Sequence, residues 1–212
     1  MKSRQMPKQM LGSRAFWLRQ MRQWHWISAG VCLVGMLVFA VTGITLNHAA
    51  KIESKPVTEV ATGALPQTLL QALKSAAPGG KAPLPDEVSR WLEQAVRVSV
   101  AGRATEWSAQ EVYVALPRPG GDAWLSIDLA NGEVRYERTD RGWISYLNDL
   151  HKGRNTGWAW SLFLDVFAVG CVVFCLTGLV LLQLLSNARP STWPLVGLGV
   201  VVPVLIAMFL IH

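Results

Sequence analysis

Three long apolar blocks dominate the chain, at residues 27–46, 158–185 and 193–211. Each is long enough for a helix to cross about 30 Å of hydrocarbon, because an α-helix rises about 1.5 Å per residue. The pattern therefore predicts three transmembrane helices. The last block contains Pro194 and Pro203, which are expected to kink its helix.

The polar stretch between the first two blocks begins with short elements. Residues 51–64 show no sustained periodicity and predict a linker. Residues 66–77 and 85–95 are amphipathic, and each stretch starts with a proline, which favours the first turn of a helix. Two short helices are predicted here.

Strand patterns follow these helices. Two sets of apolar residues alternate with polar neighbours: Val96, Val98 and Val100 in the first, and Val112, Val114 and Leu116 in the second. Such alternation predicts strands with one buried face. Residues 124–129 lead into Asn131 and Gly132, a strong hairpin signal, and the chain returns at 133–137. We therefore expect a membrane protein with three transmembrane α-helices and a small α+β domain between the first and the second.

Basic residues near the N-terminus determine the expected topology. They are Lys2, Arg4, Lys8, Arg14, Arg19 and Arg22. Lys and Arg beside a span stay on the cytoplasmic side, so the N-terminus is predicted inside and the α+β domain outside. The alternative of a cleaved signal peptide is disfavoured, because the apolar run of about 20 residues exceeds the usual length of roughly 7–15 and no small-x-small site precedes Lys51.

This topology divides the chain into six parts. They are a basic cytoplasmic leader at 1–25, a transmembrane helix at 26–48, an exterior α+β domain at 49–157, a second transmembrane helix at 158–185, a cytoplasmic loop at 186–191 and a third transmembrane helix at 192–211. In a bacterium the membrane would be the inner membrane, and the domain and the C-terminus would lie in the periplasm.

Charge and single residues in the spans narrow the classes of function. The net charge of +6 lies largely in the leader, where topology and anionic lipid explain it, so no nucleic-acid partner is predicted.

Cys32, Cys171 and Cys175 fall in spans, so no disulfide framework holds the domain. Cys171 and Cys175 share a helix face, which would permit metal binding, although small apolar filler is the preferred interpretation. Asp165, the only carboxylate in a span, is a candidate for proton handling unless it stays hydrated near the outer surface.

The usual motifs of soluble enzymes are missing from the sequence. It has no Gly-rich nucleotide loop after a strand, no Cys-x-x-Cys, no Gly-x-Ser-x-Gly and no His-Glu-x-x-His. Nicotinamide binding, flavin binding and hydrolysis therefore lack support.

Several modest motifs gain weight from their order. A span is followed by an α+β domain with an IDLANGEV hairpin, then by a turn-rich segment, YLNDLHKGRNTG, and by a second span that contains Thr-Gly. From Trp24 to Leu185 the chain resembles the PepSY-associated transmembrane family, in a short three-span form. The resemblance implies a PepSY-like exterior domain. It also implies a relation to haem-containing inner-membrane reductases of ferric siderophores, whose spans carry histidines taken to be haem ligands.

Four histidines, His25, His48, His151 and His212, lie at the ends of the predicted spans. The first span leaves the membrane at His48 and the second enters it just after His151, so both rings are expected at the same outer depth. Two neutral imidazoles from neighbouring helices can take both axial positions of a haem iron. We therefore predict one haem b near the periplasmic face, held by His48 and His151. The alternative for each ring is an interfacial position like that of the nearby tryptophans.

Two basic residues next to His151 fit such a site. Lys152 and Arg154 would pair with the haem propionates, since a guanidinium makes bidentate hydrogen bonds to a carboxylate. Ordinary interfacial snorkelling is the alternative. Gly153 and Gly157 would let the backbone turn closely into the membrane.

The first two spans share a short repeat. Residues 39–46 and 174–181 both contain Phe-x-x-Thr-Gly. Because the spans run in opposite directions, one Thr-Gly is expected near the outer face and the other near the inner face, each close to the depth of a histidine. Gly43 and Gly178 would leave room for a flat macrocycle, although small residues also let membrane helices pack closely with no cofactor.

His25 does not belong to the outer pair. It lies about 23 residues before His48, hence about 35 Å along a helix, and so marks the inner face. A second haem there would need another type of ligand, five-coordination, or His25 from another protomer of a homodimer.

The leading hypothesis is a haem protein that passes electrons to a periplasmic ferric complex, such as a ferric siderophore, and so serves iron acquisition. Membrane quinol or a redox partner protein would supply the electrons. The alternative is a non-enzymatic, membrane-anchored module that binds a periplasmic partner. A haem- or metal-responsive regulator is a third interpretation.

Overall fold

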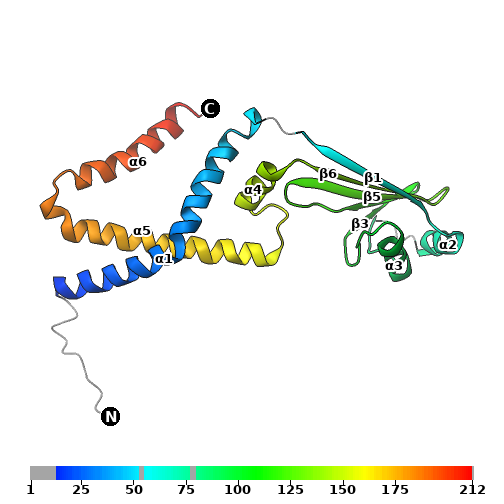
Figure 1. The fold of residues 1–212 in the computed structure, drawn as a ribbon, viewed down its shortest axis with the longest axis horizontal. Coiled ribbons are helices and arrows are strands. Elements are labelled where there is room, and N and C mark those ends of the chain that lie inside the picture. The colour runs from blue at the N-terminus through cyan, green and yellow to red at the C-terminus, as the bar shows by residue number, and fades with distance from the viewer. Residues whose placement is uncertain (1–12, 53–54, 77–79, 212) are drawn as a thin grey trace, which may run out of the picture. The chain divides into compact units, whose positions relative to one another are not determined.

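The computed structural model describes residues 13–52, 55–76 and 80–211 (Figure 1). The chain divides into two compact units. One contains the chain up to Val38 together with Leu162 onward, and the other is Phe39–Ser161. The described part of the first unit is helical, whereas the second contains a β-sheet together with the adjoining ends of two long helices.

Within the described residues, three helices are long and apolar enough to cross a membrane. They are α1 (Arg14–Asn47), α5 (Trp158–Leu185) and α6 (Thr192–Phe209). Many of their apolar side chains are not covered by other parts of the chain, as expected for helices that are surrounded by lipid. The prediction of three spans is confirmed. A short 3-10 helix, η3 (Ser186–Ala188), lies in the predicted loop between α5 and α6.

α1 begins well before the first apolar block. Its first turns carry Arg14, Arg19 and Arg22, so this part of the predicted leader is helical. Arginine is a good helix former, and residues 14–26 contain neither glycine nor proline. The other basic residues of the leader, Lys2, Arg4 and Lys8, lie outside the described residues.

The second unit is built on a six-stranded sheet. Its strands are β1 (Val57–Ala64), β2 (Gly80–Lys81), β3 (Thr105–Trp107), β4 (Glu111–Ala115), β5 (Gly121–Asp128) and β6 (Glu133–Asp140). Their order across the sheet is β1-β6-β5-β4-β3-β2, and every neighbouring pair is antiparallel.

The hairpin predicted at Asn131 and Gly132 is confirmed and joins β5 to β6. The carboxylate Oδ1 of Asp128 accepts the backbone N–H groups of Ala130 and Asn131 at 2.6 and 3.3 Å. Gly132 has a φ of 77°, a backbone conformation that favours glycine. The turn therefore has the chemistry that its sequence indicates.

Two short helices pack on the sheet, as predicted (Figure 1). They are α2 (Gln67–Ala76) and α3 (Asp86–Ala95). The core between the helices and the sheet is formed by Leu70, Leu73, Val88, Leu92, Val112, Val114, Leu125, Ile127 and Val134. Burial alternates strictly along β5, as expected for a strand with one buried face. The predicted α+β domain is therefore confirmed.

The linker predicted at 51–64 is wrong for most of its length, because residues Val57–Ala64 form β1. β1 is an edge strand that pairs with β6 alone, from Val57 opposite Asp140 to Ala64 opposite Glu133. None of its residues is buried. A strand without a buried face has no reason to alternate apolar and polar residues, so the sequence carried no signal for it.

The strand predicted at Val96, Val98 and Val100 is also wrong. The backbone here is irregular, with Arg97 at a φ of 58°. Val98 and Val100 are nevertheless buried in the core. The alternation correctly indicated which side chains are buried, but an irregular segment can bury alternate residues as well as a strand can.

The segment expected to be turn-rich is mostly helical. α4 (Trp143–Lys152) covers it as far as Gly153, which ends the helix at a φ of 66°. Only the last part is a turn, with Asn155 and Gly157 at positive φ. In a helix, side chains three residues apart lie on the same face, so such residues of α4 can contact the same neighbouring element.

Candidate functional site

His151, on α4, lies against Thr42 and Gly43 of α1. Its Nδ1 is 2.7 Å from Oγ1 of Thr42. A Cβ placed on Gly43 would lie 3.6 Å from Cε1 of the ring, which is ordinary van der Waals contact. The ring of Phe39, three residues before Thr42, has its centroid 4.9 Å from that of His151. Three neighbouring groups of α1 therefore hold one half-buried imidazole.

The surroundings of this ring favour one tautomer. Oγ1 of Thr42 donates to the carbonyl oxygen of Phe39, 3.2 Å away. When the hydroxyl proton serves the carbonyl, Nδ1 of His151 donates to Oγ1 of Thr42, and Nε2 of the neutral ring keeps its lone pair. Nε2 makes no hydrogen bond within the described part of the chain and is not buried, so it is open to a ligand.

His25, on α1, has the same arrangement against α5. Its Nδ1 is 3.0 Å from Oγ1 of Thr177 and 3.1 Å from the carbonyl oxygen of Phe174. A carbonyl oxygen only accepts, so Nδ1 is again the donor. The ring stacks on Phe174, with centroids 4.4 Å apart and planes at 18°. A Cβ on Gly178 would lie only 3.2 Å from Cε1 of the ring.

The two arrangements share one design. In each, a Phe-x-x-Thr-Gly step receives a histidine from another helix, with Nδ1 towards the threonine and the ring over the glycine. The prediction that each Thr-Gly lies close to the depth of a histidine is confirmed. The space beside Gly43 and Gly178, expected to leave room for a macrocycle, is occupied by the imidazole rings themselves.

His48 lies just beyond α1 and is exposed. Its Nδ1 is 2.9 Å from the carbonyl oxygen of Ile44, so Nδ1 is a donor here too. Within the described residues no hydrogen bond or ring contact joins His48 to His151. His151 instead contacts Thr42 of α1. Thr42 lies six residues before His48, which is about 9 Å along a helix. Their pairing as axial ligands stays a prediction.

The other predicted site residues lie near the end of α4. Lys152 is its last residue, and Arg154 follows the Gly153 cap; both are exposed. Neither forms an ion pair with another described residue. Their contact with propionates stays a prediction, as does proton handling by Asp165, which is exposed on α5. His212 lies outside the described residues.

The cysteines lie where α1 meets α5. A Cβ on Gly170 would lie 2.6 Å from Sγ of Cys32, so the buried thiol fills the space beside this glycine. Cys171 is the next residue along α5 after Gly170, and Cys175 lies one turn further. No group of three or more His, Cys, Asp or Glu side chains suited to a metal ion occurs among the described residues.

Two residues of α4 that the sequence did not single out hold the helix in place. Oδ1 of Asn148 accepts the hydroxyl of Thr45 on α1 at 2.9 Å. Oδ2 of Asp149 accepts the backbone N–H of Gly120 at 2.9 Å. Asn148 and His151 are three residues apart, so a helical interpretation of the segment would have placed both on the face towards α1.

His25, His48 and His151 all lie within the part of the chain that matches a protein family. The model of the PepSY_TM-like family matches residues 16–212. The chain belongs to the PepSY_TM-like family. The match extends beyond the resemblance found from motifs, because it also includes α6. This PepSY_TM-like protein is a membrane protein, since its long apolar helices require a lipid bilayer. No curated protein and no solved structure matches the chain.

Proposed function

We propose that this PepSY_TM-like protein is a b-type haem protein of the bacterial inner membrane that passes electrons to a ferric complex in the periplasm. The observation that carries the proposal is the setting of His151, whose Nδ1 is anchored by Thr42 while Nε2 stays open. Histidines that bind metals usually donate their other ring N–H to an oxygen, which fixes the tautomer and the orientation of the ring.

The donor set fits a haem. Nδ1 of His25 and Nδ1 of His48 each donate to a carbonyl oxygen, and Nδ1 of His151 lies 2.7 Å from the hydroxyl oxygen of Thr42. Neutral imidazole is a common axial ligand. A haem bound there would supply a one-electron couple. In this proposal His151 and His48 hold the haem near the domain, and His25, in the same local setting as His151, is the candidate ligand of a second one.

The remaining roles follow from charge and topology. The arginines of the first turns of α1 favour a cytoplasmic N-terminus and a periplasmic domain. Lys152 and Arg154 then place two exposed positive charges beside the haem, where carboxylates of the cofactor or an anionic ferric complex would be attracted. Thr42 and Thr177 act as positioning residues, because each holds the imidazole and not the iron.

Absorption spectra of the full chain in detergent, purified from haem-supplied cells, test the proposal. Oxidised and dithionite-reduced spectra of the wild type should show the narrow bands of a low-spin b-type haem. His151→Ala should lose the haem near the domain, and His48→Ala should convert it to a five-coordinate, high-spin form. His25→Ala is the matched control and should leave these bands unchanged. A featureless wild-type spectrum would contradict the proposal.

Electron transfer needs its own measurement. The reduced wild-type protein, mixed anaerobically with a ferric siderophore, should return to the oxidised spectrum as the iron becomes ferrous. Each iron accepts one electron from one reduced haem, so the amount of ferrous iron trapped by a chelator should equal the haem oxidised. Haem binding without this oxidation would instead indicate a haem-responsive regulator.

One observation favours a second candidate function, the membrane-anchored interaction module. Each imidazole already fills the space over a glycine, as a residue used only for packing would. In that case the double variant His48→Ala, His151→Ala should bind the periplasmic partner as the wild type does. The spectra separate the two functions, because only the haem protein loses absorption bands in this variant.

A further inference from the structure

α4 is held against the ends of two apolar helices. Nδ1 of His151 lies 2.7 Å from Oγ1 of Thr42, which belongs to the last turns of the apolar block at 27–46. The indole N–H of Trp160, in the first turn of α5, donates to the carbonyl of Leu150 at 2.9 Å. When α1 and α5 cross the bilayer, the end of α4 therefore lies at the level where both helices reach the edge of the hydrocarbon.

The polar and apolar sides of α4 are reversed relative to a helix on a water-soluble domain. Its buried residues are polar, namely Asn148 and Asp149. The side chain of Asn148 contacts the hydroxyl of Thr45 at 2.9 Å, and Asp149 accepts the N–H of Gly120 at 2.9 Å. A helix at the surface of a soluble domain instead buries its apolar stripe and exposes its polar residues.

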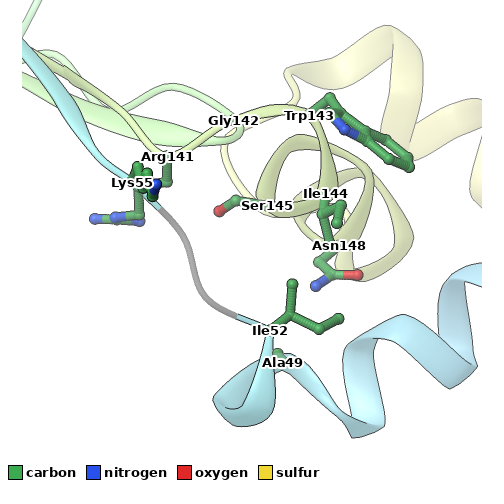
Figure 2. A pocket seen from close by; sticks show the side chains of 9 residues that line it. All are labelled: Ala49, Ile52, Lys55, Arg141, Gly142, Trp143, Ile144, Ser145 and Asn148. Atoms are coloured by element: carbon green, nitrogen blue, oxygen red, sulfur yellow. The ribbon is translucent and has the colours of Figure 1, made fainter.

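The apolar stripe of α4 is the side that the chain leaves open. Its residues recur at the spacing i, i+3, i+4 and i+7 of one helix face, and they are Trp143, Tyr146, Leu147 and Leu150. Trp143 is 70% exposed and Tyr146 is 44% exposed, whereas the two leucines are half-buried. Figure 2 shows the ring of Trp143 pointing out from the helix and away from Ser145. The described part of the chain therefore leaves the aromatic end of this stripe uncovered.

Exposed aromatic rings occur only on α4 among the described residues between α1 and α5. The other aromatic side chains of this part are all half-buried, and they are Trp91, Trp107, Tyr113, Trp124 and Tyr136. Trp158, the first residue of α5, is 80% exposed as well. Tryptophan and tyrosine are enriched at membrane interfaces, because the apolar ring enters the lipid while its polar group stays in contact with water. The exposed rings thus lie on the helix that adjoins the spans.

The charges at the end of α4 suit the same surface. Lys152 and Arg154 are exposed and form no ion pair with another described residue. Asp149 is the one carboxylate at 143–158, and it is buried. Basic residues beside a span attract anionic lipid headgroups. The same two charges attract haem carboxylates in the proposed function, so the aromatic rings are the features that distinguish a lipid-binding helix.

We propose that α4 is an interfacial helix that binds the surface of the anionic bilayer, with Trp143 and Tyr146 among the phospholipid headgroups. Only residues 153–157 separate α4 from α5, so the helix adjoins the membrane that α5 crosses. Lipid covers the apolar stripe, while Asn148 and Asp149 join the opposite side to α1 and to the turn before β5. The helix thereby keeps the sheet at the membrane surface. The proposal does not depend on haem binding.

Spin labels at single cysteines of the full chain test the proposal. Trp143→Cys and Tyr146→Cys are labelled with a nitroxide, in a background in which the three native cysteines are replaced by alanine. Glu93→Cys, at an exposed position of α3, is the control. Electron paramagnetic resonance in nanodiscs of phosphatidylcholine and phosphatidylglycerol measures how readily each label meets oxygen, which concentrates in lipid, and a water-soluble nickel complex.

Both labels on α4 should meet oxygen readily and should meet the nickel complex several-fold less than the label at Glu93→Cys does. Equal access of the nickel complex to all three labels would place the stripe in water and overturn the proposal. Low access of both reagents to the labels on α4 would show that protein covers the stripe, which would also overturn it.

A second measurement keeps the native cysteines and needs only a conservative variant. The tryptophan emission that is lost in Trp143→Phe, relative to the wild type, is the emission of Trp143 itself. In nanodiscs of phospholipids brominated on their acyl chains near the headgroup, this part of the emission should be quenched. Emission of Trp143 that brominated lipid leaves unchanged would contradict the interfacial position.

Discussion

The threonine hydroxyls favour one tautomer of each imidazole ring beside them. Thr42 donates its proton to the carbonyl of Phe39, and Thr177 donates to that of Val173 at 2.7 Å. A hydroxyl whose proton is used in this way accepts from the histidine, which favours the ring proton on Nδ1 and leaves Nε2 as the nitrogen for a ligand.

Removing this hydroxyl should weaken haem binding near the domain. Thr42→Val keeps the shape of the side chain but leaves His151 without its acceptor, and loss of such a partner typically lowers metal affinity by about 10- to 100-fold. Thr42→Ser, which keeps the hydroxyl, should retain the wild-type affinity. Haem titration of the apo-protein, followed by the Soret band, measures both. Equal affinity of the valine variant and the wild type would contradict the anchoring role.

The two glycines should differ in their tolerance of alanine. A Cβ at Gly178 would lie 3.2 Å from the ring of His25, closer than at Gly43, where the distance to His151 is 3.6 Å. Gly178→Ala should therefore lower the free energy of unfolding by about 1–3 kcal/mol through overpacking, whereas Gly43→Ala should change it little. Thermal unfolding in detergent, followed by circular dichroism, compares them. A larger loss of unfolding free energy in Gly43→Ala than in Gly178→Ala would contradict this prediction.

α4 is the element that ties the sheet to the histidine step of α1. On one side, Gly120 in the turn before β5 has a φ of 75°, and a Cβ there would lie 2.8 Å from Cα of Tyr146. On the other side, Asn148 holds Thr45 of α1. Backbone therefore packs directly against backbone at the turn, and α4 has little freedom to shift relative to the sheet.

The carboxylate of Asp149 should matter for stability through a single hydrogen bond. Asp149→Ala leaves the N–H of Gly120 without its acceptor, which should cost about 1–3 kcal/mol. Asp149→Asn keeps an oxygen in place and should recover most of the loss. Glu93→Ala, at an exposed position of α3, is the control. Thermal unfolding, followed by near-ultraviolet circular dichroism, measures the change. An Asp149→Ala variant as stable as the wild type would exclude this role.

Small residues also let α1 and α5 pack closely. A Cβ on Gly35 would collide with the ring of Phe167, and one on Gly170 would collide with Cys32. These contacts, with that of His25 against Gly178, run in opposite directions along the two helices, as expected for consecutive spans. Close approach at glycines is a common way for membrane helices to associate, because lipid provides no hydrophobic driving force between them.

At the scale of the whole molecule, three apolar helices that all cross the membrane are expected to place α1's first turns and the end of α6 on opposite sides. The sheet between α1 and α5 is then expected on the side away from the first turns of α1. The arginines of α1 favour a cytoplasmic N-terminus, so the sheet is expected in the periplasm.

Labelling of single introduced cysteines tests this orientation. Ala130→Cys lies in the exposed hairpin turn, and Asn187→Cys lies between α5 and α6. A membrane-impermeant maleimide added to spheroplasts should label the first variant and not the second. Both should react after detergent permeabilisation, and the wild type gives the background of its three native cysteines. The reverse pattern would invert the topology.

Local patterns determined much of this protein. Apolar length predicted the three spans, amphipathic periodicity predicted α2 and α3, and Asn131 with Gly132 predicted the β5–β6 hairpin, because each signal lies within a short stretch of chain. The sequence also placed histidines at the ends of the spans and a Thr-Gly step near each of two of them. It could do so because the rise of a helix converts residue number into depth.

Only the tertiary structure decided which groups meet. β1 exists because β6 offers it a partner, and the irregular backbone at Val98 and Val100 exists because α3 and the sheet leave a core to fill. The orientation of His151 depends on Thr42, which lies on another helix and far away in the chain. Such contacts leave no pattern in any local window, since each partner is chosen by packing rather than by its neighbours in sequence.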